Sequence, residues 1–156
     1  MSVQVGQDAP DFTLKNTGME DVSLSAFKGQ KNVVLLFVPL AFTGVCTKEL
    51  CSVRDNLNHY ANLDAEVFGI SVDSPFSQKA WKEKEGLNFA LLSDFNREVV
   101  QAYGAQYDNL LGFNGVAKRS AFVIDKAGKI RYAEVLESAG DLPNFEQIDA
   151  TLQSLG

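Results

Sequence analysis

Two cysteines and one histidine supply the most reactive side chains of this 156-residue chain: Cys46, Cys51 and His59. A thiolate is a strong nucleophile and an electron donor, so the chemistry that these residues suggest is nucleophilic or redox chemistry. Three soft ligands are one fewer than a closed tetrahedral zinc site needs, and we expect neither a metal nor a cofactor. Two cysteines five positions apart would close only a very small loop, so the pair is more typical of redox chemistry than of a structural disulfide.

The residues around Cys46 predict a buried strand that leads into a helix. The apolar run at 33–38 (VVLLFV) is typical of a strand that is buried on both faces. Pro39 ends that strand because it has no backbone N–H to donate, and a turn through Thr43 and Gly44 follows. From Cys46 to Tyr60 the apolar residues recur at helical spacing, at Leu50, Val53, Leu57 and Tyr60.

A cysteine at the start of a helix is well placed to act as a thiolate. Free backbone N–H groups and the helix dipole favour the negative charge there. The Thr43 hydroxyl can hydrogen-bond the thiolate or an incoming oxygen, and Pro39 shields the sulfur on one side. His59 lies about four helical turns further on, roughly 20 Å from Cys46, so a Cys-His dyad is not expected. We predict that His59 is a surface residue.

Composition excludes several classes of function. Net charge is -6 with a pI of about 4.7, which argues against binding to nucleic acid or to anionic membranes. The longest apolar runs fall short of the ~18 residues that a membrane-spanning helix needs. The first residues, MSVQVGQDAP, lack the basic and apolar regions of a signal peptide, so we expect a cytoplasmic protein. Without repeats or linkers, residues 1–156 are expected to form a single domain.

Alternating strands and helices predict an α/β fold. Besides the central strand and helix, we expect strands at 11–15, 22–24, 66–72, 89–92, 120–125 and 130–136, and helices at 75–85, 98–103 and 143–155. The stretch 104–118 shows no periodicity and is expected to be a loop. This order is typical of a thioredoxin-like sandwich, in which a central mixed β-sheet is flanked by helices. In such folds the first strand-to-helix junction carries the site, and here it carries Cys46.

The motif Pro39-x-x-x-Thr43-x-x-Cys46 resembles the active-site motif of the peroxiredoxins, thiol peroxidases of the thioredoxin fold. Glu49 matches the acidic residue common three places after the reactive cysteine. Arg119 falls where that family keeps its active-site arginine, at the start of the strand SAFVID. The resemblance extends over nearly the whole chain, from GQDAPDFTL through LLSDF to KRSAFVIDKAGKIRY.

This resemblance implies a peroxidase mechanism. Cys46 would attack the terminal oxygen of hydrogen peroxide or an organic hydroperoxide and become a sulfenic acid. Thr43 would position the peroxide, Pro39 would shield the intermediate, and Arg119 would stabilise the thiolate and the charge that develops on oxygen. Glu49 would either support the helix start electrostatically or pair with Arg119 or Lys48.

Two subgroup patterns are combined in the chain. PLAFTGVC, Ala80-Trp81 and LLSDF resemble the alkyl hydroperoxide reductase E group, which generally works with one cysteine. CTKELC resembles the Q group (bacterioferritin-comigratory proteins), in which the second thiol, here Cys51, resolves the sulfenic acid. On an ideal helix the Cα atoms of Cys46 and Cys51 are about 8.6 Å apart, whereas a disulfide usually requires less than about 7 Å. A resolving Cys51 therefore requires the helix start to unwind; the alternative is an inert, structural Cys51.

The resemblance also implies partners. Electrons would return from thioredoxin or a glutaredoxin-like protein, and a homodimer that buries Phe42 and Trp81 near the active site is a further expectation. Trp81, Phe42 and Phe89 are expected to be core or interface aromatics rather than substrate contacts. Two rival functions stay open: a protein disulfide oxidoreductase, although its C-x-x-C spacing is absent, and a redox-regulated binding or holdase protein.

Overall fold

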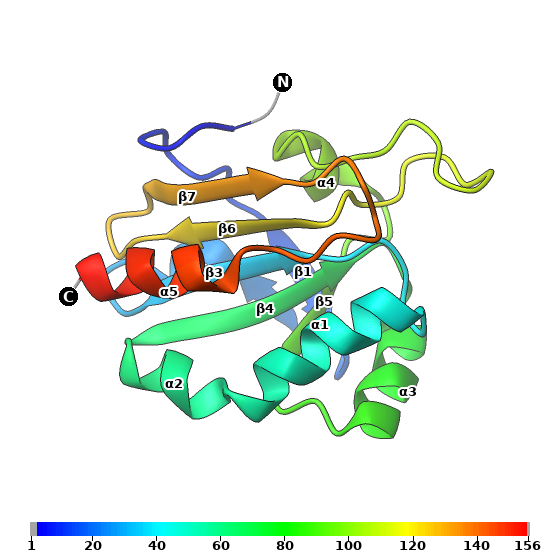
Figure 1. Cartoon of the computed structure of the whole chain (residues 1–156), viewed down its shortest axis with the longest axis horizontal. Coiled ribbons are helices and arrows are strands. Elements are labelled where there is room, and N and C mark those ends of the chain that lie inside the picture. The colour runs from blue at the N-terminus through cyan, green and yellow to red at the C-terminus, as the bar shows by residue number, and fades with distance from the viewer. Residues whose placement is uncertain (1–2, 156) are drawn as a thin grey trace.

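The computed structural model describes residues 3–155. Its strands are β1 Thr13–Asn16, β2 Asp21–Ser23, β3 Asn32–Phe37, β4 Ala65–Ser71, β5 Ala90–Ser93, β6 Ser120–Ile124 and β7 Ile130–Val135. Its helices are the 3₁₀ helix η1 Leu24–Phe27 and the α-helices α1 Gly44–Asp55, α2 Leu57–Asn62, α3 Pro75–Glu85, α4 Glu98–Ala102 and α5 Phe145–Ser154. The strands form one seven-stranded sheet in the order β2-β1-β5-β4-β3-β6-β7, and Figure 1 views it from the side that carries α1, α2 and α5.

The sheet is mixed, and its central strands β3, β4 and β6 each have one end at the same side of the sheet. β3 pairs with β4 in parallel, with Phe37 opposite Ile70, so both strands end at the same edge. β6 pairs with β3 in antiparallel, with Ser120 opposite Phe37, so β6 begins where β3 ends. The residues that follow β3 and β4 and those that precede β6 therefore meet at one edge of the sheet.

Helices cover both faces of the sheet. Along β3, Val34 and Leu36 pack into a core under α1, α2, α3 and α5. Val33 and Leu35 pack into the opposite core, under η1 and α4. All six residues of β3 are buried, as the continuous apolar run predicts. The predicted α/β sandwich with a central mixed sheet is confirmed.

The predicted helix at 46–60 is in fact two helices. α1 ends at Asp55, and α2 begins at Leu57 after Asn56, which has φ −117° and ψ 19°. The Asn56 side chain donates to the carbonyl of Ser52 at 2.9 Å, which satisfies a free carbonyl at the end of α1. The periodicity continued across the break because both helices turn an apolar side toward the same core.

Most other predicted elements match the structure within one to three residues. Ser74 caps α3 by accepting a hydrogen bond from the backbone N–H of Ser77, and Gly86 ends that helix in the left-handed conformation that glycine tolerates best. The stretch 104–118 is a loop held by isolated bridges, of which Gln106–Ala117 is one. Among residues 3–155, every helix is too short or too polar to cross a membrane.

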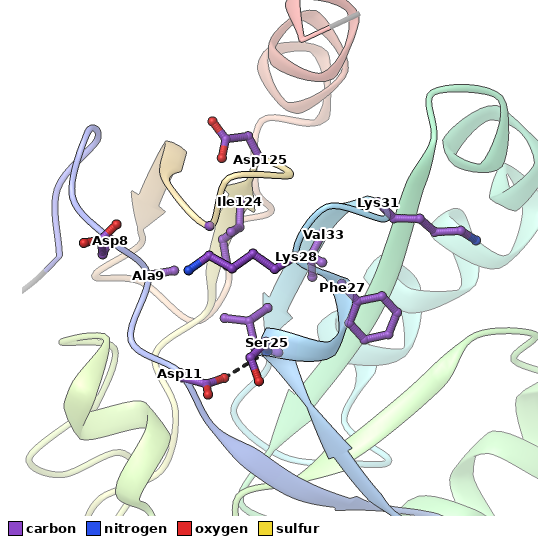
Figure 2. Close-up of a pocket in the computed structure, with 12 residues that line it drawn as sticks. Asp8, Ala9, Asp11, Ser25, Phe27, Lys28, Lys31, Val33, Ile124 and Asp125 are labelled. Carbon is purple, nitrogen blue, oxygen red and sulfur yellow. Dashed lines mark hydrogen bonds between the residues drawn. The ribbon is translucent and has the colours of Figure 1, made fainter.

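A small cavity of about 130 Å³ lies at the end of β3 remote from Pro39. Val33 and Ile124 contribute to its apolar lining, and Lys28 extends across it (Figure 2). At its rim the Asp11 carboxylate accepts a hydrogen bond from the backbone N–H of Ser25 at 3.0 Å. The length of β3 separates this cavity from Cys46.

Candidate active site

The loop between β3 and α1 is held in place by hydrogen bonds at several points. The backbone N–H of Ala41 donates to Asp73 Oδ2 at 2.8 Å, which ties the loop to the end of β4. Phe42 has φ 65°, a left-handed conformation that is uncommon for a residue other than glycine. The Thr43 hydroxyl donates to the carbonyl oxygen of Leu40 at 2.8 Å, and Thr43 is the N-cap residue of α1. The loop thus reaches the helix in one defined conformation.

The sulfur of Cys46 lies inside the protein beside a cation. Cys46 is the third residue of α1 and is only 1% exposed. Pro39, in the preceding loop, is also buried. Nη2 of Arg119 donates to Cys46 Sγ at 3.1 Å, although the two residues are 73 positions apart in the sequence. A cationic donor at this distance stabilises a thiolate more than a neutral thiol.

Arg119 is held by three acceptors. Besides the sulfur, Nη1 donates to Glu49 Oε1 at 2.8 Å and Nε donates to the carbonyl oxygen of Ala139 at 3.1 Å. Arg119 is 2% exposed and precedes β6, which places it at the edge where β3 ends. These contacts fix the plane of the guanidinium, so its Nη2 donor is in position before any substrate arrives.

Glu49 is a buried carboxyl with one free oxygen. Its side chain is fully buried, and Oε2 has no hydrogen-bond partner among residues 3–155. Burial raises the pKa of Glu49 to about 7, while the ion pair with Arg119 opposes that rise. Of the alternatives considered for Glu49, the structure shows the pairing with Arg119; Lys48 is exposed.

Cys51 lies on the same helix in a different environment. Both cysteines are free thiols, and Cys51 Sγ donates to Glu85 Oε2 in α3 at 3.6 Å. Burial raises the pKa of Cys51; the Glu85 carboxylate adds to the rise, and Arg54 opposes it. Because α1 is continuous from Gly44 to Asp55, Cys46 and Cys51 keep their helical separation.

Three predicted site residues are thus brought together in direct contact: Cys46, Glu49 and Arg119. Thr43 and Pro39 belong to the loop that leads to them. His59 lies on the surface of α2, where Nε2 is 3.2 Å from Asp149 Oδ2 in α5. It therefore belongs to the contact between α2 and α5.

The structure also places residues at the site that sequence reasoning missed. Asp73 precedes the helix expected at 75–85 and was not among the predicted site residues, yet it holds the loop after β3. The indole N–H of Trp81 donates to the Thr47 hydroxyl at 3.1 Å, which ties the first turn of α1 to α3. The available signal for Asp73 was its position after a parallel strand, where α/β folds assemble their sites. No local pattern indicates the Trp81–Thr47 contact.

The aromatic residues divide between core and surface. Trp81 and Phe89 are buried in the core under α1, whereas Phe42 is 50% exposed. The Phe42 ring lies against Trp81, with 6.2 Å between the ring centroids. An exposed aromatic side chain therefore lies in the loop that leads to Cys46.

Known proteins are similar to this chain in both sequence and fold. The AhpC/TSA family matches residues 5–133. Alkyl hydroperoxide reductase E of Mycobacterium tuberculosis is 44% identical over 135 residues, which cover 85% of this chain and 86% of that protein. Peroxiredoxin-2 of Mus musculus is 37% identical over 162 residues, which cover 97% of this chain and 77% of that protein.

Solved structures agree with the sequence relatives. Peroxidoxin BcpB from Mycobacterium tuberculosis superposes with a TM-score of 0.87 at 32% identity, over 98% of both chains. The mitochondrial 2-Cys peroxiredoxin from Plasmodium falciparum gives a TM-score of 0.83 at 34% identity, over 97% of this chain and 94% of that one. The chain belongs to the AhpC/TSA family and is a thiol-dependent peroxidase of the peroxiredoxin type.

Proposed function

We propose that Cys46 is the peroxidatic cysteine of this enzyme. Its thiolate sulfur attacks the terminal oxygen of hydrogen peroxide or an organic hydroperoxide, and the O–O bond breaks. Cys46 becomes a sulfenic acid, while the leaving oxygen takes up a proton and departs as water or an alcohol. The observation that carries this proposal is the 3.1 Å contact between Arg119 Nη2 and Cys46 Sγ in a buried position.

Arg119, Thr43 and Pro39 support that step in different ways. Arg119 holds the thiolate and stabilises the negative charge that develops on the departing oxygen. The Thr43 hydroxyl, whose proton is directed to the Leu40 carbonyl in the resting protein, presents its oxygen as an acceptor for a peroxide O–H. Pro39 shields the sulfenic acid, and Glu49 keeps the guanidinium in place.

Cys51 is the proposed resolving cysteine. Its thiolate attacks the sulfenic sulfur of Cys46, an S–S bond forms, and the hydroxyl group leaves as water after taking a proton. This step requires the first turns of α1 to unwind, because five helical positions separate the two thiols. Unwinding also takes Cys51 away from Glu85, whose carboxylate disfavours its thiolate.

Thioredoxin or a glutaredoxin-like protein then reduces the disulfide. The alternative is a one-cysteine cycle with a structural Cys51, which the similarity to alkyl hydroperoxide reductase E favours. We further propose that the protein is a single cytoplasmic domain that forms a homodimer over the exposed Phe42. Its substrate class is the hydroperoxides.

The test compares wild type with Cys46→Ser and Cys51→Ser. Each protein receives one equivalent of peroxide for mass spectrometry, and turnover is then measured with thioredoxin and with glutaredoxin plus glutathione. We expect the wild type to lose two hydrogen atoms, as an intramolecular disulfide requires, and Cys51→Ser to gain one oxygen. Cys46→Ser should lose at least about a thousandfold in peroxide consumption.

Two results would contradict parts of the proposal. Unchanged thioredoxin-linked turnover in Cys51→Ser would assign the protein to the one-cysteine cycle. Peroxide consumption that survives Cys46→Ser would show that another group is the nucleophile.

A further inference from the structure

Asp73 connects the end of β4 to the loop that carries the proposed peroxide-binding groups. Because β3 and β4 are parallel, the segments that follow them lie side by side. Asp73 Oδ2 accepts two hydrogen bonds, from the backbone N–H of Ala41 at 2.8 Å and from the Ser71 hydroxyl at 2.7 Å. Asp73 is thus the side chain that ties this loop to β4.

A buried network fixes the orientation of the Asp73 carboxylate. Gln78, only 1% exposed, donates from Nε2 to Ser71 Oγ at 2.9 Å and to the carbonyl oxygen of Leu92 at 2.8 Å. The Ser93 hydroxyl donates to the backbone carbonyl of Asp73 at 2.6 Å. Groups on α3, β4 and β5 therefore hold Asp73, and the loop is attached to the centre of the fold.

Ala41, the residue that Asp73 holds, lies in the part of the loop whose conformation sets the position of Thr43. Ala41 stands between Leu40, whose carbonyl accepts the Thr43 hydroxyl, and Phe42, which has a left-handed backbone. A residue other than glycine is strained in that region and keeps this conformation only where its surroundings enforce it. Without the hydrogen bond between Asp73 and Ala41, we expect the backbone of Phe42 to leave its left-handed conformation, which would shift the Thr43 hydroxyl away from Cys46.

We propose that Asp73 is a positioning residue for the peroxidatic step. Through Ala41 it holds the loop so that the Thr43 hydroxyl meets the hydroperoxide beside Cys46. This inference rests on the proposed roles of Cys46 and Thr43. Asp73 acts through the backbone of Ala41, and the hydrogen bonds of its carboxylate found among residues 3–155 are those from Ala41 and Ser71.

A positioning role predicts a selective effect on one of two reactions of the same thiolate. Attack on a peroxide requires the O–O bond to be aligned with the sulfur, which depends on Thr43. Alkylation of Cys46 by iodoacetamide requires a reactive and accessible thiolate but no aligned peroxide. Loss of the Asp73 carboxylate should therefore slow peroxide reduction much more than alkylation.

The experiment measures both second-order rate constants in wild type, Asp73→Ala, Asp73→Asn and a control variant, Asp11→Ala. All four also carry Cys51→Ser, so that only Cys46 reacts. Peroxide oxidation is followed by stopped-flow fluorescence of Trp81, the single tryptophan. Asp11→Ala removes a carboxylate that likewise accepts one backbone N–H, from Ser25, at the opposite end of β3 (Figure 2).

We expect the Asp73→Ala change to lower the peroxide rate constant about tenfold and the alkylation rate constant less than about twofold. Asp73→Asn keeps an oxygen that can accept both hydrogen bonds, so it should restore the peroxide rate constant to within about threefold of wild type. Asp11→Ala should leave the ratio of the two rate constants unchanged.

The inference is overturned if the Asp73→Ala change slows both reactions equally or leaves peroxide oxidation at the wild-type rate. If Asp73→Ala fails to fold, Ser71→Ala removes one of the two donors to the carboxylate and should shift the same ratio in the same direction. An unchanged ratio there would also overturn it. Failure of the wild-type Cys46 to react with peroxide would instead contradict the proposed function itself.

Discussion

The first and second halves of α1 each carry one thiol, and the two thiols lie beside opposite charges. Near its start, Cys46 Sγ lies 3.1 Å from the guanidinium of Arg119. Five residues later, Cys51 Sγ lies 3.6 Å from the carboxylate of Glu85. The guanidinium beside Cys46 favours negative charge on sulfur, whereas burial and the Glu85 carboxylate raise the pKa of Cys51 against the opposing charge of Arg54. The helix supplies both sulfurs, but the elements packed against it set the charge beside each one, and this difference supports the proposal that Cys46 is the nucleophile.

The two ends also differ in how α1 is attached to its neighbours. The start is held by the contacts of Arg119 and by the hydrogen bond from Trp81 to Thr47. The Cys51 end is held by Glu85, whose side chain accepts from Cys51 and whose backbone carbonyl accepts from Arg54. Disulfide formation must break contacts of both kinds. Oxidation changes the sulfur to which Arg119 donates, so we expect it to weaken this contact and to lower the free-energy cost of unwinding.

The largest difference between the two ends should appear when each arginine is replaced. We expect Arg119→Lys to lower the rate constant for peroxide oxidation of Cys46 roughly a hundredfold, because an ammonium cannot replace the planar donor set that reaches Cys46, Glu49 and Ala139. Stopped-flow measurement checks it. Arg54→Lys, beside Cys51, is the matched control and should change this rate constant by less than about twofold. Equal losses in both variants would contradict the comparison.

Titration of Glu49, near the start of α1, should make the free energy of unfolding of the protein depend on pH. Because burial raises the pKa of Glu49 from 4.5 to about 7, the folded protein binds more protons than the unfolded chain between these values. The contribution of Glu49 to stability is fully present below pH 4.5 and is lost as pH rises to about 7, by an amount on the order of 3 kcal/mol. Glu49→Gln should remove this slope from urea unfolding measured across the window. Parallel pH profiles for the two proteins would refute the prediction.

Loosening the start of α1 should speed the formation of the disulfide. Thr47→Val leaves the buried indole N–H of Trp81 without its acceptor, which should destabilise the first turn by about 1 kcal/mol. Disulfide formation after one equivalent of peroxide, followed by quenched mass spectrometry, should become several times faster. Thr151→Val serves as the control. It removes a comparable hydroxyl from α5, one that donates to the carbonyl oxygen of Gln147. A slower disulfide in Thr47→Val would show that the first turn need not open.

The smallest effect is expected at the Cys51 end. Glu85→Gln removes the carboxylate that helps raise the pKa of Cys51, so that pKa should fall. In a Cys46→Ser background, alkylation of Cys51 at a pH below its pKa should therefore become about two to five times faster. A rate equal to that of Cys46→Ser alone would mean that burial by itself controls this thiol.

The sequence predicted those features that depend on neighbouring residues. The apolar run before Pro39 predicted β3, and the helix expected at 75–85 matches α3 at both ends, where Ser74 and Gly86 flank it. The break between α1 and α2 at Asn56 was not predicted. Hydrophobic periodicity shows which side of a helix is buried, but it cannot show that the Asn56 side chain binds the Ser52 carbonyl where α1 ends. The motif from Pro39 to Cys46 indicated the family, because its residues lie within eight consecutive positions of the chain.

By itself, then, the sequence determined the order of elements and the family, and it predicted Cys46 as the reactive cysteine. The tertiary structure decided which groups contact Cys46 and the loop before it. The register between β3 and β6 brings Arg119 to Cys46, and the parallel pairing of β3 with β4 brings Asp73 to Ala41. It also decided that Glu49 pairs with Arg119 and that Cys51 faces Glu85. Spacing along the chain cannot specify such contacts, because they depend on how distant elements pack and on the charges that packing places together.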